Sequence, residues 1–134
     1  MHQQLLDQLL RAAQHEAQQQ GVPITVTLVD IGGHVQAVQR HEACSYFALE
    51  SSRQKAVTAS QLRLPSHMVG DLSQQFPALA ASFQANPVIS GLPGGLPITW
   101  NGAVIGGLGI AGGNFEQDRT IAEAALASLT TRPE

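Results

Sequence analysis

The fold of this chain is decided by residues 91–118, which read GLPGGLPITWNGAVIGGLGIAGGNFEQD. Asn101 and Gly102 stand between two apolar runs, and an Asn-Gly pair accepts the positive φ angles of a type I′ turn. We therefore predict that Leu96–Trp100 pairs antiparallel with Ala103–Ile110. The segment reads as a hairpin followed by a glycine-lined loop and the start of a helix.

Glycines also interrupt the second of these strands. Gly106, Gly107 and Gly109 predict a bulge, or a place where a ligand or another backbone comes close. Residues 107–112 match the pattern GxGxxG, which marks dinucleotide sites when it joins a strand to a helix. That mechanism also needs a second parallel strand and an acidic residue about 20 positions further on, and neither follows here. We interpret the glycines as a tight strand-to-helix turn whose N–H groups could still receive an anion or a propionate.

Composition limits the classes of partner. With 134 residues and 43% hydrophobic residues, the chain is expected to form one domain, residues 1–134, around one core. Aromatic residues make up only 4%, so alanine, valine, isoleucine and leucine must fill that core. The net charge is −3 and there is no basic run, which argues against a nucleic-acid partner. A small molecule or another protein is the expected partner.

Cysteine content and apolar runs bear on location. Cys44 is the single cysteine, so an intrachain disulfide and the multi-cysteine metal motifs are excluded. No basic segment leads into an unbroken apolar stretch at the start, and no apolar run approaches the roughly 20 residues that span a bilayer. We expect a cytoplasmic protein without a membrane partner.

Helical and strand periodicities predict the remaining elements. A capping residue, Ser45 or Asn114, opens each of the last two long helices, and Gly21 ends the first. The chain is expected to begin with a helix whose apolar stripe covers residues 5–17, followed by a hairpin of Ile24–Val29 with His34–Gln39 and a helix from Ser45 to about Leu62. An irregular segment over 63–87 comes next, with at most a short helix at Ala78–Gln84. The glycine-rich hairpin and a final helix from Asn114 complete the order. Two antiparallel hairpins separated by helices predict an α+β domain.

Four co-linear motifs resemble one known family. They read VTLVDIGGHVQAVQRHEA, KAVTA at Lys55–Ala59, LPGGLPI, and GAVIGGLGIAGGNFEQD with the following IAEAAL. This pattern is similar to the GlcG/HbpS family, which includes the C-terminal domain of PduO. The resemblance implies a profilin-like α/β/α sandwich with a five-stranded antiparallel sheet. It also implies haem binding in several members and assembly into multi-subunit rings or octamers.

The five histidines, which are His2, His15, His34, His41 and His67, form no i, i+4 pair and no HExxH motif, so a catalytic zinc site has little support. A haem iron needs only one or two axial ligands. His15 lies about 160° from the centre of its helix's apolar stripe, so it can serve only a surface or an intersubunit site. The resemblance to PduO-type relatives makes His15 a candidate axial ligand. His34 closes the VDIGGH turn, where it could reach a pocket or merely complete the turn.

Four further residues are candidates for cofactor binding. Lys55 falls within the small-residue arc of its helix, where it could bind a propionate or another acid, or could extend to solvent over its packed stem. Gly94 and Gly95 belong to the LPGGLPI motif. Asp118 has a structural explanation as an acid near a helix start, and we assign it no catalytic role without a neighbour.

The resemblance predicts a haem- or tetrapyrrole-binding homo-oligomer with an accessory, storage or sensing role. Binding, rather than catalysis, is the function expected. One alternative is a small enzyme acting on a small carboxylic acid or aldehyde, in which Lys55 holds the anion and His34 or Asp118 moves a proton. Another is a non-catalytic structural partner of such an enzyme.

Overall fold

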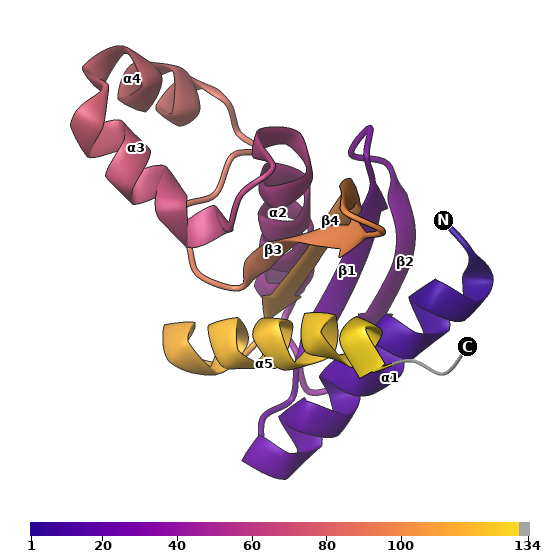
Figure 1. Ribbon diagram of the computed structural model, residues 1–134. Coiled ribbons are helices and arrows are strands. Elements are labelled where there is room, and N and C mark those ends of the chain that lie inside the picture. Colours follow the sequence, from indigo (N-terminus) through magenta and orange to yellow (C-terminus); the bar gives the residue numbers. More distant parts are fainter. Residues whose placement is uncertain (132–134) are drawn as a thin grey trace.

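A computed structural model describes residues 1–131 of the chain, so residues 132–134 of the predicted 1–134 domain lie outside it (Figure 1). The predicted helices and strands occur in the expected order, and two further short elements follow the second long helix. Their bounds are α1 Gln3–Gln20, β1 Thr25–Asp30, β2 Val35–Arg40, α2 Tyr46–Leu62, a 3₁₀ turn Ser66–Met68, α3 Val69–Gln75, α4 Pro77–Ala85, β3 Gly95–Trp100, β4 Ala103–Ala111, α5 Phe115–Ala127 and a 3₁₀ turn Ser128–Thr131.

All strand pairs are antiparallel, and the strands lie in the order β2-β1-β4-β3. The predicted Asn101–Gly102 turn joins β3 to β4, with φ angles of 52° and 80°. Trp100 therefore pairs with Ala103 directly across the turn. The register shifts between Ile98 and Thr99, so an irregularity of the predicted kind occurs in this hairpin. The α+β class and both predicted hairpins are confirmed.

The expectation of a five-stranded sheet is wrong for the described residues, in which four strands pair. The segment before β3, residues 86–94, contains turns and does not join the sheet. Its polar backbone groups are taken up by helix side chains: Gln54 donates to the Pro87 carbonyl, and Thr58 donates to the Val88 carbonyl and accepts from the Ser90 N–H. Proline also lacks the N–H that a strand ladder requires. The segment is thus anchored along α2.

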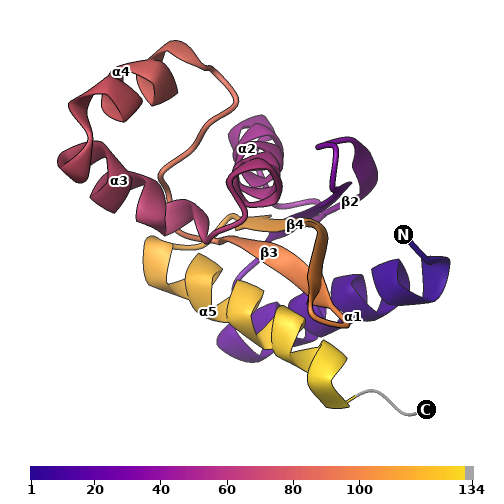
Figure 2. The same cartoon turned by 45° about the horizontal axis from the view of Figure 1, so that its top comes forward.

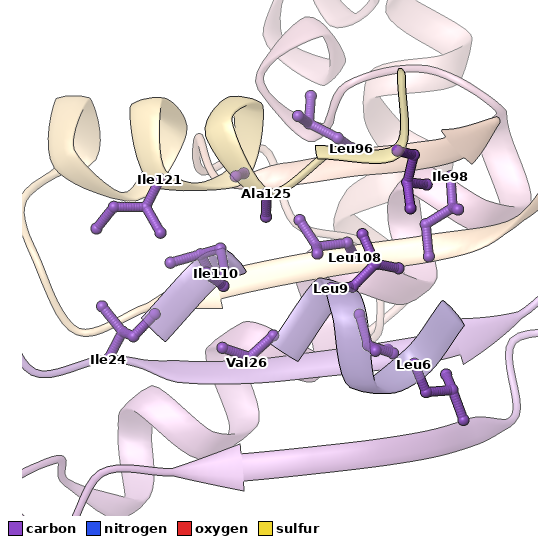
Figure 3. Packing of buried hydrophobic residues seen from close by; sticks show 14 of the residues in the cluster. Leu6, Leu9, Ile24, Val26, Leu96, Ile98, Leu108, Ile110, Ile121 and Ala125 are labelled. Carbon is purple, nitrogen blue, oxygen red and sulfur yellow. The ribbon is translucent and has the colours of Figure 1, made fainter. Parts of the chain in front are cut away.

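Helices cover both faces of the sheet, with α2 on one side and α1 and α5 on the other (Figure 2). The face under α1 and α5 is packed with large aliphatic side chains. They come from both helices, from β1, β3 and β4, and from Ile24 just before β1. Figure 3 labels Leu6, Leu9, Ile24, Val26, Leu96, Ile98, Leu108, Ile110, Ile121 and Ala125. This apolar cluster is the main core.

The opposite face is built from small residues. A Cβ atom added to Gly107 would collide with the Ala56 carbonyl, and one added to Gly109 would collide with the Ser52 carbonyl. Helix α2 therefore lies directly against the backbone of β4. The glycine spacing had predicted a close backbone approach in this strand, and the structure confirms it.

The segment between α2 and β3 is more helical than predicted. Helix α4 matches the short helix expected at Ala78–Gln84, whereas the 3₁₀ turn and α3 were not predicted. Helix α3 is too short to show an apolar stripe, and it packs mainly against α4. Both helices stand away from the sheet (Figures 1 and 2). None of the helices in residues 1–131 is long and apolar enough to cross a membrane.

Candidate functional site

A buried ion pair joins α2 to the start of α5. Lys55 Nζ donates to Asp118 Oδ2 at 3.1 Å and to the Ile110 carbonyl at 2.7 Å. The two charged side chains are only 2% and 3% exposed. The acid that Lys55 binds within this chain is thus Asp118. The sequence alone had shown no partner for Asp118, and the structure provides Lys55.

The loop between β4 and α5 holds the acid in place. The Gly113 N–H donates to Asp118 Oδ1 at 2.9 Å. Asn114 caps α5 in a capping box, since its side chain accepts from the Gln117 N–H and the Gln117 side chain accepts from the Asn114 N–H. Both carboxylate oxygens of Asp118 therefore have donors, and the predicted helix start is confirmed.

Two glycines allow the chain before β3 to pass beside this pair. Gly94 has φ of 122°, and a Cβ atom there would lie 2.6 Å from the Ile110 oxygen and 3.1 Å from Lys55 Nζ. A Cβ atom on Gly95 would meet the Lys55 carbonyl. The sequence-predicted residues Lys55, Gly94, Gly95 and Asp118 are therefore neighbours in space.

Burial shifts both ionisable groups toward their neutral forms. Loss of solvation lowers the pKa of Lys55, and the attraction of Asp118 opposes that shift. Loss of solvation likewise raises the pKa of Asp118, against the effects of Lys55 and the Gly113 N–H. Each charged group is thus stabilised by contact with the other at a poorly solvated position, so removing one of them would leave the other charge uncompensated.

A cavity of about 190 Å³ opens beside the ion pair. Its walls come from the first turns of α2 and α5, the loop between β4 and α5, and the chain before β3. They comprise Ser45, Phe47, Ala48, Ser51, Lys55, Leu92, Ala111, Gly112, Gly113, Phe115 and Asp118. Phe47 and Phe115 are 70% and 59% exposed, so two aromatic rings that line the cavity also face solvent.

The two predicted axial ligands lie elsewhere. The His15 ring on α1 is exposed and lies 3.1 Å from Gln19 Nε2. The His34 side chain is 79% exposed, and its Nδ1 lies 3.2 Å from Asp30 Oδ1. Gln61 ties this turn to the C-terminal end of α2, while the cavity adjoins the N-terminal end. Neither histidine lines the Lys55 cavity.

Other titratable clusters give no metal centre. Among residues 1–131, no group of three or more His, Cys, Asp or Glu side chains could hold a metal ion. His41 lines a separate cavity of about 370 Å³ between the end of α1 and the end of β2. Its Nδ1 accepts from the Ala43 N–H at 3.0 Å. That bond gives His41 a role in turning the chain toward α2.

The model of a protein family described as haem degrading protein HbpS-like matches residues 1–127. The chain belongs to this HbpS-like family. A 15.0 kDa protein of the dhaT-dhaS intergenic region of Citrobacter freundii is 37% identical over 121 residues, which cover 88% of this chain and 84% of that protein. The corrinoid adenosyltransferase PduO of Salmonella typhimurium is also 37% identical, over 92% of this chain but only 37% of its own length.

A solved structure extends the HbpS-like kinship to the fold. The crystal structure of a PduOC:heme complex superposes with a TM-score of 0.88 and 34% sequence identity. The match covers 96% of this chain and 94% of that one. The fold described here is thus shared along nearly its whole length with a relative that was crystallised with haem.

Sequence reasoning missed part of the HbpS-like chain's cavity. Ser51 precedes Lys55 by four positions on α2, so the two side chains share one helix face. That spacing was the available signal for Ser51. Phe47 and Phe115 carried no comparable signal, because their approach to one cavity depends on how two distant helices are packed.

Proposed function

We propose that this chain is a haem- or tetrapyrrole-binding protein that acts in the cytoplasm as a homo-oligomer, in an accessory, storage or sensing role. The observation that carries the proposal is its 34% identity, over 96% of the chain, to the relative in the PduOC:heme complex. Haem, when bound, would supply an iron whose reactivity is set by its axial ligands and their surroundings. The whole chain, residues 1–134, would act as one domain.

The exposed histidines are compatible with such a group at a subunit boundary. His34 has an exposed ring, and the apolar side chains of Ile31 and Val35 near it are 41% and 46% exposed. His15 is likewise exposed on the outer side of α1. A porphyrin needs apolar walls as well as an axial ligand. The described residues of one chain leave the imidazole rings of both His15 and His34 exposed. A second subunit would complete the enclosure.

Association has support from an edge of the sheet. Within residues 1–131, strand β2 pairs only with β1, and α2 packs on β1, β3 and β4. Val35 and Val38 therefore remain 46% and 43% exposed on a sheet edge, where another chain can pair or pack. We expect light scattering at micromolar protein to give a multiple of the monomer mass. A monomer mass alone would contradict the oligomer.

A hemin titration tests the ligand. We expect saturable binding with a Soret band distinct from that of free hemin. Replacing His34 or His15 by alanine should change that band while the free energy of unfolding stays within about 0.5 kcal/mol, because both residues are exposed. His2→Ala serves as a matched control on another exposed histidine. Its spectrum should equal that of the wild type.

The outcomes separate the ligand from its axial residue. Absence of saturable hemin binding by the wild-type protein would refute the haem proposal. A band that survives both His34→Ala and His15→Ala would refute these axial ligands and direct the search to His41, His67 and Cys44.

A further inference from the structure

The N-termini of two long helices meet at the cavity beside Lys55. Ser45, Phe47 and Ala48 line it from the start of α2, and Gly113 and Phe115 line it from the start of α5. The first N–H groups of a helix have no intrahelical partner, and the helix dipole adds a partial positive charge at the same end. Two such ends beside one cavity favour an anion there.

One hydroxyl that faces this cavity has no partner within the described part of the chain. Ser51 is 3% exposed as a residue and lines the cavity, and its Oγ makes no hydrogen bond with any described residue. Other buried serines on α2 do find partners: Ser52 donates to the Leu49 carbonyl and Ser60 to the Asp30 carbonyl. The Ser51 hydroxyl is therefore open to the cavity and free to donate to a ligand there, and an oxygen of a bound ligand would supply the acceptor that the described residues do not.

The local charge balance is neutral, so attraction for an anion must come from the helix ends and from directed donors. Lys55 and Asp118 offset each other, and no other charged side chain among residues 1–131 lines the cavity. An ammonium has three donors, of which Asp118 and the Ile110 carbonyl take two. The Asp118 carboxylate would repel a second anion, but both its oxygens already accept from Lys55 and Gly113.

Size and wall chemistry narrow the ligand class. At about 190 Å³ the cavity is smaller than the roughly 300–1,000 Å³ of sites for drug-sized ligands, so a porphyrin ring cannot enter it. Leu92, Phe47 and Phe115 give it apolar walls that continue to the surface. A charged group with a short carbon chain matches this combination better than inorganic phosphate does.

We propose that this cavity binds one carboxylate group carried on a short carbon chain, with Ser51 Oγ and Lys55 Nζ as donors. The carboxylate comes either from a free short-chain acid or from a propionate arm of a tetrapyrrole whose ring stays outside, against Phe47 and Phe115. The two sources share the same chemistry at the cavity. The site rests on the geometry of this chain and does not require the haem proposal to hold.

The test is a titration of the ¹⁵N-labelled full chain with sodium propionate, followed by amide shifts of Ser51, Gly112 and Gly113. Saturable shifts are expected with propionate, and much weaker ones with the neutral analogue propionamide and with inorganic phosphate. Ser51→Ala should weaken propionate binding tenfold or more, since it removes a hydrogen bond to a charged group. Ser60→Ala is the matched control, because its hydroxyl lies on the same helix and bonds elsewhere.

A double variant tests the ammonium without leaving an orphan charge. Lys55→Met with Asp118→Asn removes both charges and keeps an acceptor for the Gly113 N–H. If its amide spectrum remains folded, propionate binding should be lost. Equal responses to propionate and propionamide, or an unchanged affinity in Ser51→Ala, would overturn the proposal.

Competition identifies the source of the carboxylate. Protoporphyrin IX that displaces propionate, while its dimethyl ester does not, would indicate a propionate arm in the cavity. Propionate binding that is indifferent to porphyrin would indicate a free acid. Hemin binding is read separately from its Soret band, so a failure of the haem proposal and a failure of this one give different results.

Discussion

The two faces of the sheet are packed in different ways. Helices α1 and α5 cover one face with interlocking leucine and isoleucine side chains, whereas α2 lies against the other through glycine, alanine and serine. On the aliphatic face, the distance between helix and sheet is set by side chains that can repack. On the α2 face, the distance between helix and sheet is set by direct contact between the α2 backbone and the β4 backbone. The buried Lys55–Asp118 pair joins this face to the start of α5. This comparison indicates that the α2 face is the less tolerant of change and the one suited to hold a polar site.

Breaking the ion pair should give the largest effect. Lys55→Met leaves the Asp118 carboxylate buried without its cation, which costs about 3–5 kcal/mol of unfolding free energy. The double variant Lys55→Met with Asp118→Asn should lose clearly less, because no unpaired charge remains. Denaturant unfolding at pH 7 measures both. A single variant as stable as the double would show that the charges do not depend on each other.

The glycine contact on the same face comes next. Gly109→Ala places a methyl group against the Ser52 carbonyl of α2, so we expect a loss at or above the upper end of the roughly 1–3 kcal/mol of overpacked cores. Gly70→Ala on α3 is the matched control, since a Cβ atom there meets nothing within 4 Å. The control should be neutral or gain up to about 1 kcal/mol from helix propensity.

The aliphatic face should tolerate a change of similar size better. Ile121 on α5 is fully buried in the main cluster. Ile121→Val removes one methylene and should cost about 0.5–1.5 kcal/mol, measured by the same unfolding experiment. If Ile121→Val cost more than Gly109→Ala, the contrast between the two faces would be incorrect.

The same contrast explains how far the sequence could predict the structure. The Asn101–Gly102 turn and the caps at Ser45 and Asn114 were predictable, because each is set by a few adjacent residues. The partner of Lys55 was not, since Asp118 lies 63 positions away and meets it only through packing. The glycines of β4 predicted a close approach but carried no information on which element approaches.

A family resemblance had similar limits. It correctly indicated the family and an antiparallel sheet, but the expected fifth strand is absent from the described residues. Whether the backbone of the 86–94 segment bonds to a strand or to a helix depends on α2, whose Gln54 and Thr58 bond to that backbone. No local pattern in the segment itself carries that information. The haem ligands His15 and His34 remain predictions.

The smallest expected effect concerns a polar cluster that is exposed. Backbone N–H donation by His34 is the main cause that holds the pKa of Asp30 below its usual range, with further contributions from the Gly32 N–H and the His34 ring. A carboxylate whose pKa is lower in the folded state stabilises the fold above its unfolded pKa of about 3.9, and that contribution is lost as pH falls through the folded value.

Wild type should therefore lose more stability than Asp30→Asn between pH 5 and pH 2, in denaturant unfolding at each pH. Glu42→Gln, which changes an exposed carboxylate without a hydrogen bond among the described residues, should follow the wild-type curve. An Asp30→Asn curve parallel to the wild type would show that this turn adds nothing, whereas an effect as large as that of Lys55→Met would mean that burial is not what distinguishes the α2 face.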